Sequence, residues 1–145
     1  LSEPQVALWA VTAVAVFKTI GFTMVLFHAA LQNVPAEVIE ASRIDGAGPV
    51  QRFVFVPLPL IAPFTFLVVI LVTISSFKTF ALFYVLTGGG PGDATRTLSY
   101  YIYDTAFRFF SLGYASTLSV ILFAAIFVLT VLQFVTRRRW MHEEL

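Results

Sequence analysis

A short charged stretch interrupts an otherwise apolar chain, and its acidic side chains are the first candidates for specific chemistry. Residues 40–59 read EASRIDGAGPVQRFVFVPLP and contain the acids Glu40 and Asp45. Exposed carboxylates of this kind can form charge-assisted hydrogen bonds with arginine side chains of another protein. Small residues beside them would let a partner approach closely, namely Ala41, Ser42 and Ala47. The pattern favours a docking segment, and a solvated connector is the alternative.

A second polar group lies inside an apolar segment. Ser75, Ser76 and Thr79 follow the i, i+1, i+4 spacing that puts side chains on one side of a helix. Lys78 projects roughly 100° away from that side. The hydroxyls suit either packing between membrane helices, where small polar residues are common, or the lining of a polar path.

Two lysines fall within long apolar runs, Lys18 and Lys78. Ionisable groups at membrane depth are costly and indicate function by default. The alternative for each is a side chain that extends its amine to the membrane surface or is satisfied inside a helix bundle.

Most catalytic and metal chemistries find no support in the residues. The chain has no cysteine, which excludes disulfides, thiolate metal sites and cysteine nucleophiles. His28 and His142 are isolated, no nucleophile lies beside a base, and no Gly-Lys-Ser/Thr follows the glycines at 88–92. We therefore predict no catalytic residue, no metal ligand, no cofactor and no nucleic-acid partner.

The composition is that of a membrane protein. The 145 residues are 59% hydrophobic and 12% charged, whereas a soluble domain is roughly 25% charged. A membrane-spanning helix needs about 20 mostly apolar residues. Three segments satisfy this length, at residues 6–31, 58–87 and 112–136. The predicted fold is an all-α membrane protein with three transmembrane helices.

The distribution of arginines predicts the orientation. Short loops rich in lysine and arginine stay in the cytoplasm. Arg137, Arg138 and Arg139 follow the third segment, and the loop at 32–57 holds two more arginines. We therefore expect this loop and the C-terminus to be cytoplasmic and the loop at 88–111 to be extracytoplasmic. An extracytoplasmic N-terminus without a signal peptide suggests that earlier spans are absent from this chain.

The cytoplasmic loop is expected to contain a helix of about three turns, from Pro35 to Asp45. Proline is favoured at the first helical position, and Glu37 and Glu40 in the first turns suit the helix dipole. Gly46 and Gly48 then provide a C-terminal stop. A second short helix is expected over residues 50–56. Prolines that would break the start of the next span follow it, namely Pro57, Pro59 and Pro63.

These residues resemble the EAA motif of membrane subunits in bacterial ATP-binding-cassette importers. The matching positions are Glu40-Ala41-Ser42, Asp45-Gly46-Ala47 and Leu58-Pro59. The motif name expects alanine where this chain has Ser42. Residues 33–35, 86–91 and 101–114 are similar to the carbohydrate-uptake branch, which includes permeases for oligosaccharides and glycerol phosphate. Such permeases have about six spans, and this chain is similar to their C-terminal half.

The resemblance implies a role for each part. The helix from Pro35 to Asp45 would be a coupling helix that contacts a cytoplasmic ATPase subunit, with Glu40 as the main ionic contact. The resemblance also implies that Ser75, Ser76 and Thr79 line the substrate path. The further candidates for that path are Lys18 and Lys78, as ionisable groups at membrane depth, and Gly21 and Phe22 in the first segment. ATP hydrolysis would belong to the partners, so this chain would perform no chemistry itself.

The implied assembly lies in the bacterial inner membrane. It would contain a second permease subunit, two ATPase subunits and an extracytoplasmic solute-binding protein, and its substrate would be a sugar or a sugar phosphate. Two other functions stay open on the residues alone: an ion-coupled secondary transporter that uses Lys18 or Lys78, and a membrane scaffold that does not transport.

Overall fold

Every regular element in the described part of the chain is a helix. The computed structural model describes residues 3–140, and side chains from residue 3 to residue 136. The chain divides into two compact units, one formed by residues 1–18 and 72–145 and the other by residues 19–71. The all-α class predicted from composition is confirmed.

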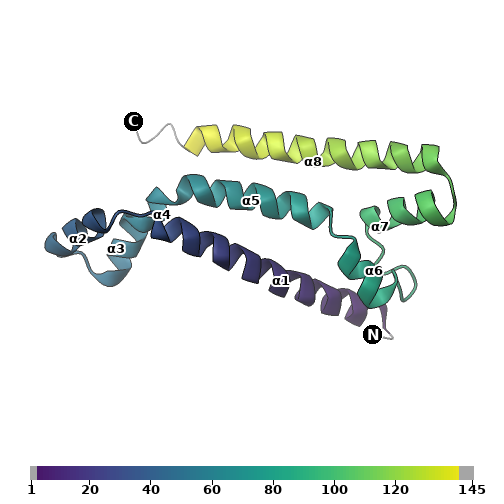
Figure 1. Cartoon of the computed structure of the whole chain (residues 1–145), viewed down its shortest axis with the longest axis horizontal. Coiled ribbons are helices and arrows are strands. Elements are labelled where there is room, and N and C mark those ends of the chain that lie inside the picture. Colours follow the sequence, from purple (N-terminus) through teal and green to yellow (C-terminus); the bar gives the residue numbers. More distant parts are fainter. Residues whose placement is uncertain (1–2, 141–145) are drawn as a thin grey trace. The chain divides into compact units, whose positions relative to one another are not determined.

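The unit of residues 19–71 contains the charged stretch. The long helix α1 (Pro4–Gln32) ends in this unit, and α2 (Ala36–Ile44) follows after a short turn. Two more short helices, α3 (Pro49–Phe55) and α4 (Pro57–Leu60), lead into α5 (Ala62–Phe77). Figure 1 shows α2 and α3 folded beside each other next to α4. The rings of Phe27 on α1 and Phe64 on α5 meet edge to face with centroids 6.4 Å apart.

A sharp bend separates α3 and α4 from α5. The direction of the chain changes by 67° between Pro49–Leu60 and Ala62–Phe77. Pro63 has no backbone N–H to donate to the carbonyl four residues earlier, and its ring crowds that carbonyl. The expected proline-broken start of the second apolar segment is therefore present as a bend at Ile61.

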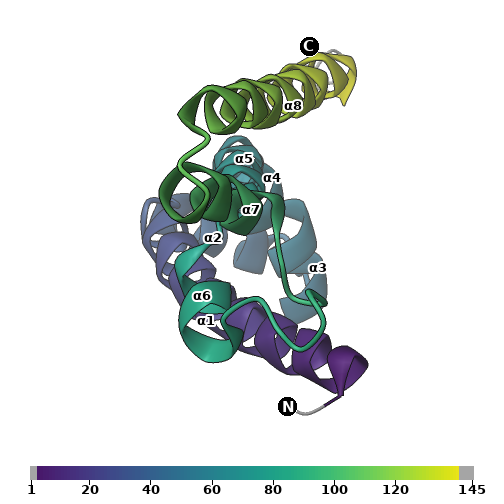
Figure 2. The ribbon, with the colours of Figure 1, turned by 90° about the vertical axis from the view of Figure 1, so that its right-hand side faces the viewer.

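The other unit contains the remaining helices. After α5 ends, the chain forms α6 (Ala81–Thr87), a glycine-rich loop and α7 (Leu98–Tyr103). A π-helical turn, η1 (Asp104–Arg108), leads to the long helix α8 (Leu112–Trp140). Figure 2 shows the loop that runs from α6 back to α7. Gln133 of α8 donates to the Thr73 hydroxyl of α5 over 2.9 Å, which joins these two helices by a polar contact.

Two single helices in the described residues are long and apolar enough to cross a membrane, Pro4–Gln32 and Leu112–Thr136. The bent pair that ends at Phe77 supplies a third candidate if it counts as one span. These positions agree with two of the expected segments. The expected segment at 58–87 is different, because the structure divides it into α4, α5 and α6.

The division after Phe77 coincides with hydroxyl-to-backbone bonds and with a contact from a distant residue. The Ser76 hydroxyl donates to the Val72 carbonyl and the Thr79 hydroxyl donates to the Ser75 carbonyl, both over 2.8 Å. Hydroxyls that bond to the backbone in this way compete with the helical ladder. The carbonyl of Phe77 instead accepts a hydrogen bond from the Ser99 hydroxyl, at 2.8 Å. The end of α5 is thus satisfied by a residue 22 positions later.

The aromatic segment at 98–110, expected as one helix, is also divided. The helix α7 covers only its first six residues, and η1 covers the next five. Phe110 then adopts a positive φ of 53°. A bulky residue rarely takes this conformation, so the backbone here turns sharply before α8 begins.

Candidate functional site

The helix α2 ends in a complete Schellman motif. Gly46 has a φ of +80°, which glycine adopts without strain. The Gly46 N–H donates to the Arg43 carbonyl and the Ala47 N–H donates to the Ser42 carbonyl. This pair of bonds satisfies carbonyls that a helix end otherwise leaves unpaired. Gly46 therefore fixes where α2 stops, as its position in the sequence predicted.

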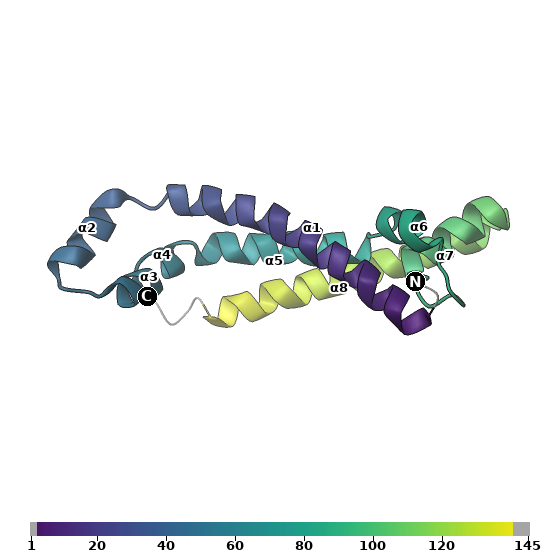
Figure 3. The same ribbon diagram turned by 90° about the horizontal axis from the view of Figure 1, so that it is seen from below.

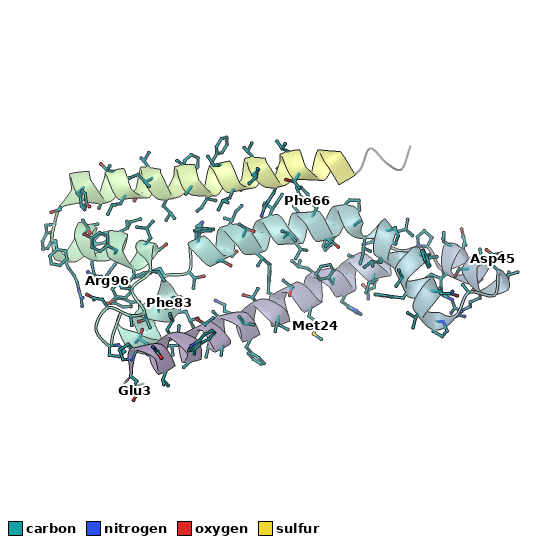
Figure 4. All side chains as sticks on the ribbon, turned by 180° about the vertical axis from the view of Figure 1, so that it is seen from behind. Glu3, Met24, Asp45, Phe66, Phe83 and Arg96 are labelled. Atoms are coloured by element: carbon teal, nitrogen blue, oxygen red, sulfur yellow. The ribbon has the colours of Figure 1, made fainter. Side chains whose placement is uncertain are left out.

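The acids of this region point to solvent. Glu37, Glu40 and Asp45 are exposed, and none of them forms an ion pair with the part of the chain that the structure describes. Figure 4 shows Asp45 at the start of the turn that follows α2. Carboxylates arranged in this way are available to cations on another protein.

Small residues of the motif divide between the surface and the interior. Ala41 is exposed and Ala47 is half-buried, but Ser42 is buried and its hydroxyl donates to the Ile39 carbonyl over 2.7 Å. Ser42 thus packs inside its own unit. A serine fits where the motif name expects alanine, because its hydroxyl has a partner one turn back along the helix.

The turn between α2 and α3 is held by side chains of α3. Arg52 donates from Nη2 to the Ala47 carbonyl over 3.1 Å, and Gln51 accepts from the Gly48 N–H. Figure 3 shows α2 and α3 joined by this turn beyond the end of α1. The two short helices are therefore tied together at their connection.

Exposed apolar side chains also lie on α2 and α3. Ile44 is 88% exposed, and Val50 and Phe55 are also largely exposed. Large apolar side chains in a contiguous exposed region are typical of interaction surfaces. The α2–α3 region thus combines carboxylates with apolar contact area.

The second candidate site lies at the end of α5. Ser75, Ser76 and Lys78 are exposed, and Thr79 is half-buried. The hydroxyls of Ser76 and Thr79 donate their protons to helix carbonyls. Their oxygens keep lone pairs, so these residues can accept hydrogen bonds from a polar solute.

The remaining predicted path residues lie on α1. Lys18, Gly21 and Phe22 are exposed there. Lys18 belongs to the unit that contains the end of α5, whereas Gly21 and Phe22 belong to the other unit. Among the described residues, no hydrogen bond or ion pair joins Lys18 to Ser75, Ser76 or Thr79, so a shared path stays a prediction.

A buried ion pair near α7 was not predicted from the sequence. Arg96 donates from Nη2 to Oδ2 of Asp104 over 2.7 Å, and Asp104 is only 2% exposed. Arg108 approaches Oδ1 of Asp104 at 3.4 Å, and Arg96 also reaches Asp93 at 3.3 Å. Figure 4 shows Arg96 in the loop beside α7. One signal was available: Arg108 follows Asp104 by four residues, the spacing of a helical ion pair.

The rings of Phe80 and of Tyr84 on α6 pack on tyrosines of α7. Phe80 lies 5.7 Å from Tyr100 and 4.8 Å from Tyr103, measured between ring centroids. Tyr84 completes the group, with centroids 5.8 Å from Tyr100 and 5.4 Å from Tyr103. The hydrogen bond with Tyr84 raises the pKa of the Tyr103 hydroxyl above its usual value. The aromatic residues of 98–110 are thus split between this group, in which Tyr100 is buried, and exposed phenylalanines.

Residues 1–142 match the family described as the binding-protein-dependent transport system inner membrane component. The chain belongs to this family. The resemblance found in residues 40–59 is therefore confirmed. The long apolar helices α1 and α8 agree with membership in a family of inner membrane components.

Three relatives of this inner membrane component illustrate its similarities. The putative ABC transporter permease protein ORF1 of Caldicellulosiruptor sp. (strain Rt8B.4) is 43% identical over 94% of this chain and 99% of ORF1. The sn-glycerol-3-phosphate transport system permease protein UgpA of Escherichia coli O157:H7 is 43% identical over 88% of this chain and 44% of UgpA. The sulfoquinovosyl glycerol transport system permease protein SmoG of Agrobacterium fabrum (strain C58) is 39% identical over 85% of this chain and 40% of SmoG.

The chain thus spans less than half the length of UgpA and SmoG. These relatives are named as permease proteins of transport systems and not as enzymes. Residues 3–136 also hold no group of three or more metal-ligating side chains.

Proposed function

We propose that this inner membrane component is part of a permease subunit in an ATP-driven importer for a sugar or sugar phosphate. Its partners would be a second permease subunit, two cytoplasmic ATPase subunits and an extracytoplasmic solute-binding protein. The names of UgpA and SmoG support a polar, glycerol-containing substrate class.

The α2–α3 region carries this proposal. Its carboxylates are free of ion pairs within the described chain, and exposed apolar residues such as Ile44 lie beside them. In this proposal Glu40 pairs with a cation of the ATPase, with Glu37 and Asp45 beside it. The apolar residues fill the contact. Ala41 and Ala47 allow close approach, while Ser42 and Gly46 keep the shape of α2.

Motion would pass from α2 to the membrane through short, tied elements. Arg52 links α3 to the turn after α2, and α3 and α4 lead directly to the bend before α5. Movement of α2 by the ATPase would therefore reach α5 without a long flexible loop. Alternating access of the path would follow from that displacement.

We assign the substrate path to the end of α5. Ser75, Ser76 and Thr79 would accept hydrogen bonds from solute hydroxyls, and the ammonium of Lys78 would pair with a phosphate group. Lys18, which belongs to the same unit, would add a second ammonium to the lining. The proposed contact between α2 and the ATPase requires α2 to be cytoplasmic, because the ATPase acts there. With three spans, the C-terminus would lie on the same side.

The variant Glu40→Lys tests the proposal. Charge reversal at a desolvated contact typically costs about 2–5 kcal/mol, so we expect solute-stimulated ATP hydrolysis to fall by at least about tenfold. The measurement is ATPase activity of the reconstituted complex with its binding protein, over a panel of sugars and sugar phosphates. The matched control is Glu3→Lys, which reverses an exposed acid outside α2.

Three outcomes are informative. Loss of stimulation in Glu40→Lys with an unchanged Glu3→Lys supports the proposal. Full stimulation in Glu40→Lys contradicts the role of Glu40. Solute uptake by the intact complex without ATP would instead favour an ion-coupled transporter.

A further inference from the structure

The ion pair between Arg96 and Asp104, called here the α7 ion pair, closes the two ends of a very short helix. Only the six residues of α7 separate the N-terminal turn from Asp104. A helix this short is not stable in isolation. Thr97 caps its start by accepting from the Tyr100 N–H, and Asp104 follows its last residue. The ion pair therefore supplies a tertiary constraint that α7 lacks by itself.

The loop that carries Arg96 is held by hydrogen bonds of the neighbouring Thr95. Thr95 is 1% exposed, and its hydroxyl donates to the Gly90 carbonyl over 2.9 Å and lies 2.7 Å from the Thr87 hydroxyl. The guanidinium of Arg96 also lies over the Tyr101 ring, 5.2 Å from its centroid. Arg96 is thus anchored at the end of α6, and it holds Asp104 relative to that anchor.

The helix α7 also contacts the residues that follow α5. The Ser99 hydroxyl donates to the Phe77 carbonyl over 2.8 Å. Tyr100 and Tyr103 pack on Phe80. These contacts are made at Phe77 and Phe80, which flank Lys78 and Thr79 in the sequence. Ser75 and Ser76 directly precede Phe77. Displacement of α7 would remove the contacts on both sides of Lys78 and Thr79.

We propose that the α7 ion pair is a positioning device for the substrate path. It holds α7 so that Ser99 and the tyrosines fix the chain after α5, and it does not itself touch solute. Removal of one partner of a buried ion pair is strongly destabilising, because the other group loses its hydrogen bond, so loss of either partner would displace η1 and α7. This inference rests on the assignment of the path made above, which the experiment tests separately.

The experiment uses the complete reconstituted transporter with sn-glycerol 3-phosphate as the probe. The chain has no cysteine, so Ala81→Cys offers one spin-label position just after the break. Side-chain mobility is measured by electron spin resonance, together with the half-saturating probe concentration, the maximal rate and basal ATP hydrolysis. The variants are Asp104→Asn, the conservative Asp104→Glu and Ser99→Ala. The control is Asp93→Asn, at an exposed partner of Arg96.

In Asp104→Asn we expect greater label mobility and a half-saturating concentration raised between about 2-fold and 30-fold, the range seen for residues that act without touching a ligand. Basal ATP hydrolysis should be retained. Ser99→Ala, which leaves the ion pair intact, should shift both values in the same direction. Asp104→Glu should restore them partly, and Asp93→Asn should leave them unchanged.

Unchanged mobility and half-saturation in both Asp104→Asn and Ser99→Ala overturn the inference. So does a loss of the assembled complex in Asp104→Asn while Ser99→Ala has no effect, because the ion pair would then serve folding alone. If no variant transports the probe, the label still decides whether α7 positions the chain after α5. The proposed substrate class would then be the part that fails.

Discussion

At the scale of single residues, two glycines of the loop after α6 differ in what a side chain at their position would contact. Gly89 and Gly92 both have positive φ values, 86° and 57°. A side chain added at Gly89 would meet a Tyr100 ring carbon at 3.2 Å, whereas Gly92 faces open space. Tyr100 is 1% exposed and packed between other rings, so it has little room to move. Gly89 therefore serves packing as well as backbone conformation.

This difference predicts unequal effects of alanine. Gly92→Ala should cost about 1–2 kcal/mol through its left-handed conformation. Gly89→Ala should cost about 1–3 kcal/mol more, because the overlap with Tyr100 adds to the same conformational cost. Thermal unfolding of the detergent-purified complex measures both, and Gly92→Ala is the control. Equal losses of stability would contradict the role of the Tyr100 contact.

At the scale of elements, Pro63 lies at the bend before α5. Pro63 lacks the N–H that would bond to the Pro59 carbonyl and continue α4 into α5, while Pro49 occupies the first position of α3, where no donor is needed. Proline is therefore costly to helix continuity at 63 and neutral at 49. If α3, α4 and α5 carry the motion of α2, the angle at this bend determines how far α5 moves.

Pro63→Ala should straighten the connection between α4 and α5. We expect a longer distance between spin labels at Val50→Cys and Leu67→Cys, measured by double electron–electron resonance, because a backbone hydrogen bond becomes available across the bend. Solute-stimulated ATP hydrolysis should decrease with it. Pro49→Ala should change neither value. A distance that stays the same in Pro63→Ala would mean that packing, and not the proline, sets the bend.

At the scale of the whole molecule, the orientation follows from the arginine distribution and from the proposed contact of α2 with a cytoplasmic ATPase. Glu37 on α2 and Asp93 in the loop before α7 are both exposed, which makes them suitable reporters. The absence of cysteine means that each can be labelled alone. The proposal requires them to lie on opposite sides of the membrane.

Asp93→Cys should react with a membrane-impermeant maleimide in intact spheroplasts. Glu37→Cys should react only after the membrane is permeabilised. Labelling is read from the mass of the purified chain, and lysed spheroplasts of both variants are the control. Reaction of Glu37→Cys in intact cells would remove the basis for an ATPase contact at α2.

The sequence by itself determined the features that depend on local signals. Composition predicted an all-α membrane protein, and Pro35 with Gly46 predicted the bounds of α2 to within a residue. Proline restricts the backbone angles and glycine widens them wherever they occur. The length of an apolar segment decides whether it can cross a membrane. Both signals act without contacts to distant residues. The motif in residues 40–59 was sufficient to predict the family.

Only the tertiary structure decided the features that depend on residues far apart in the chain. The segment at 58–87 is apolar throughout its length, yet α5 ends at Phe77, where a hydroxyl from Ser99 satisfies its carbonyl. Asp104 is buried and pairs with Arg96, which comes from the loop before α7. Such pairings require a specific path of the backbone, which composition and periodicity do not encode.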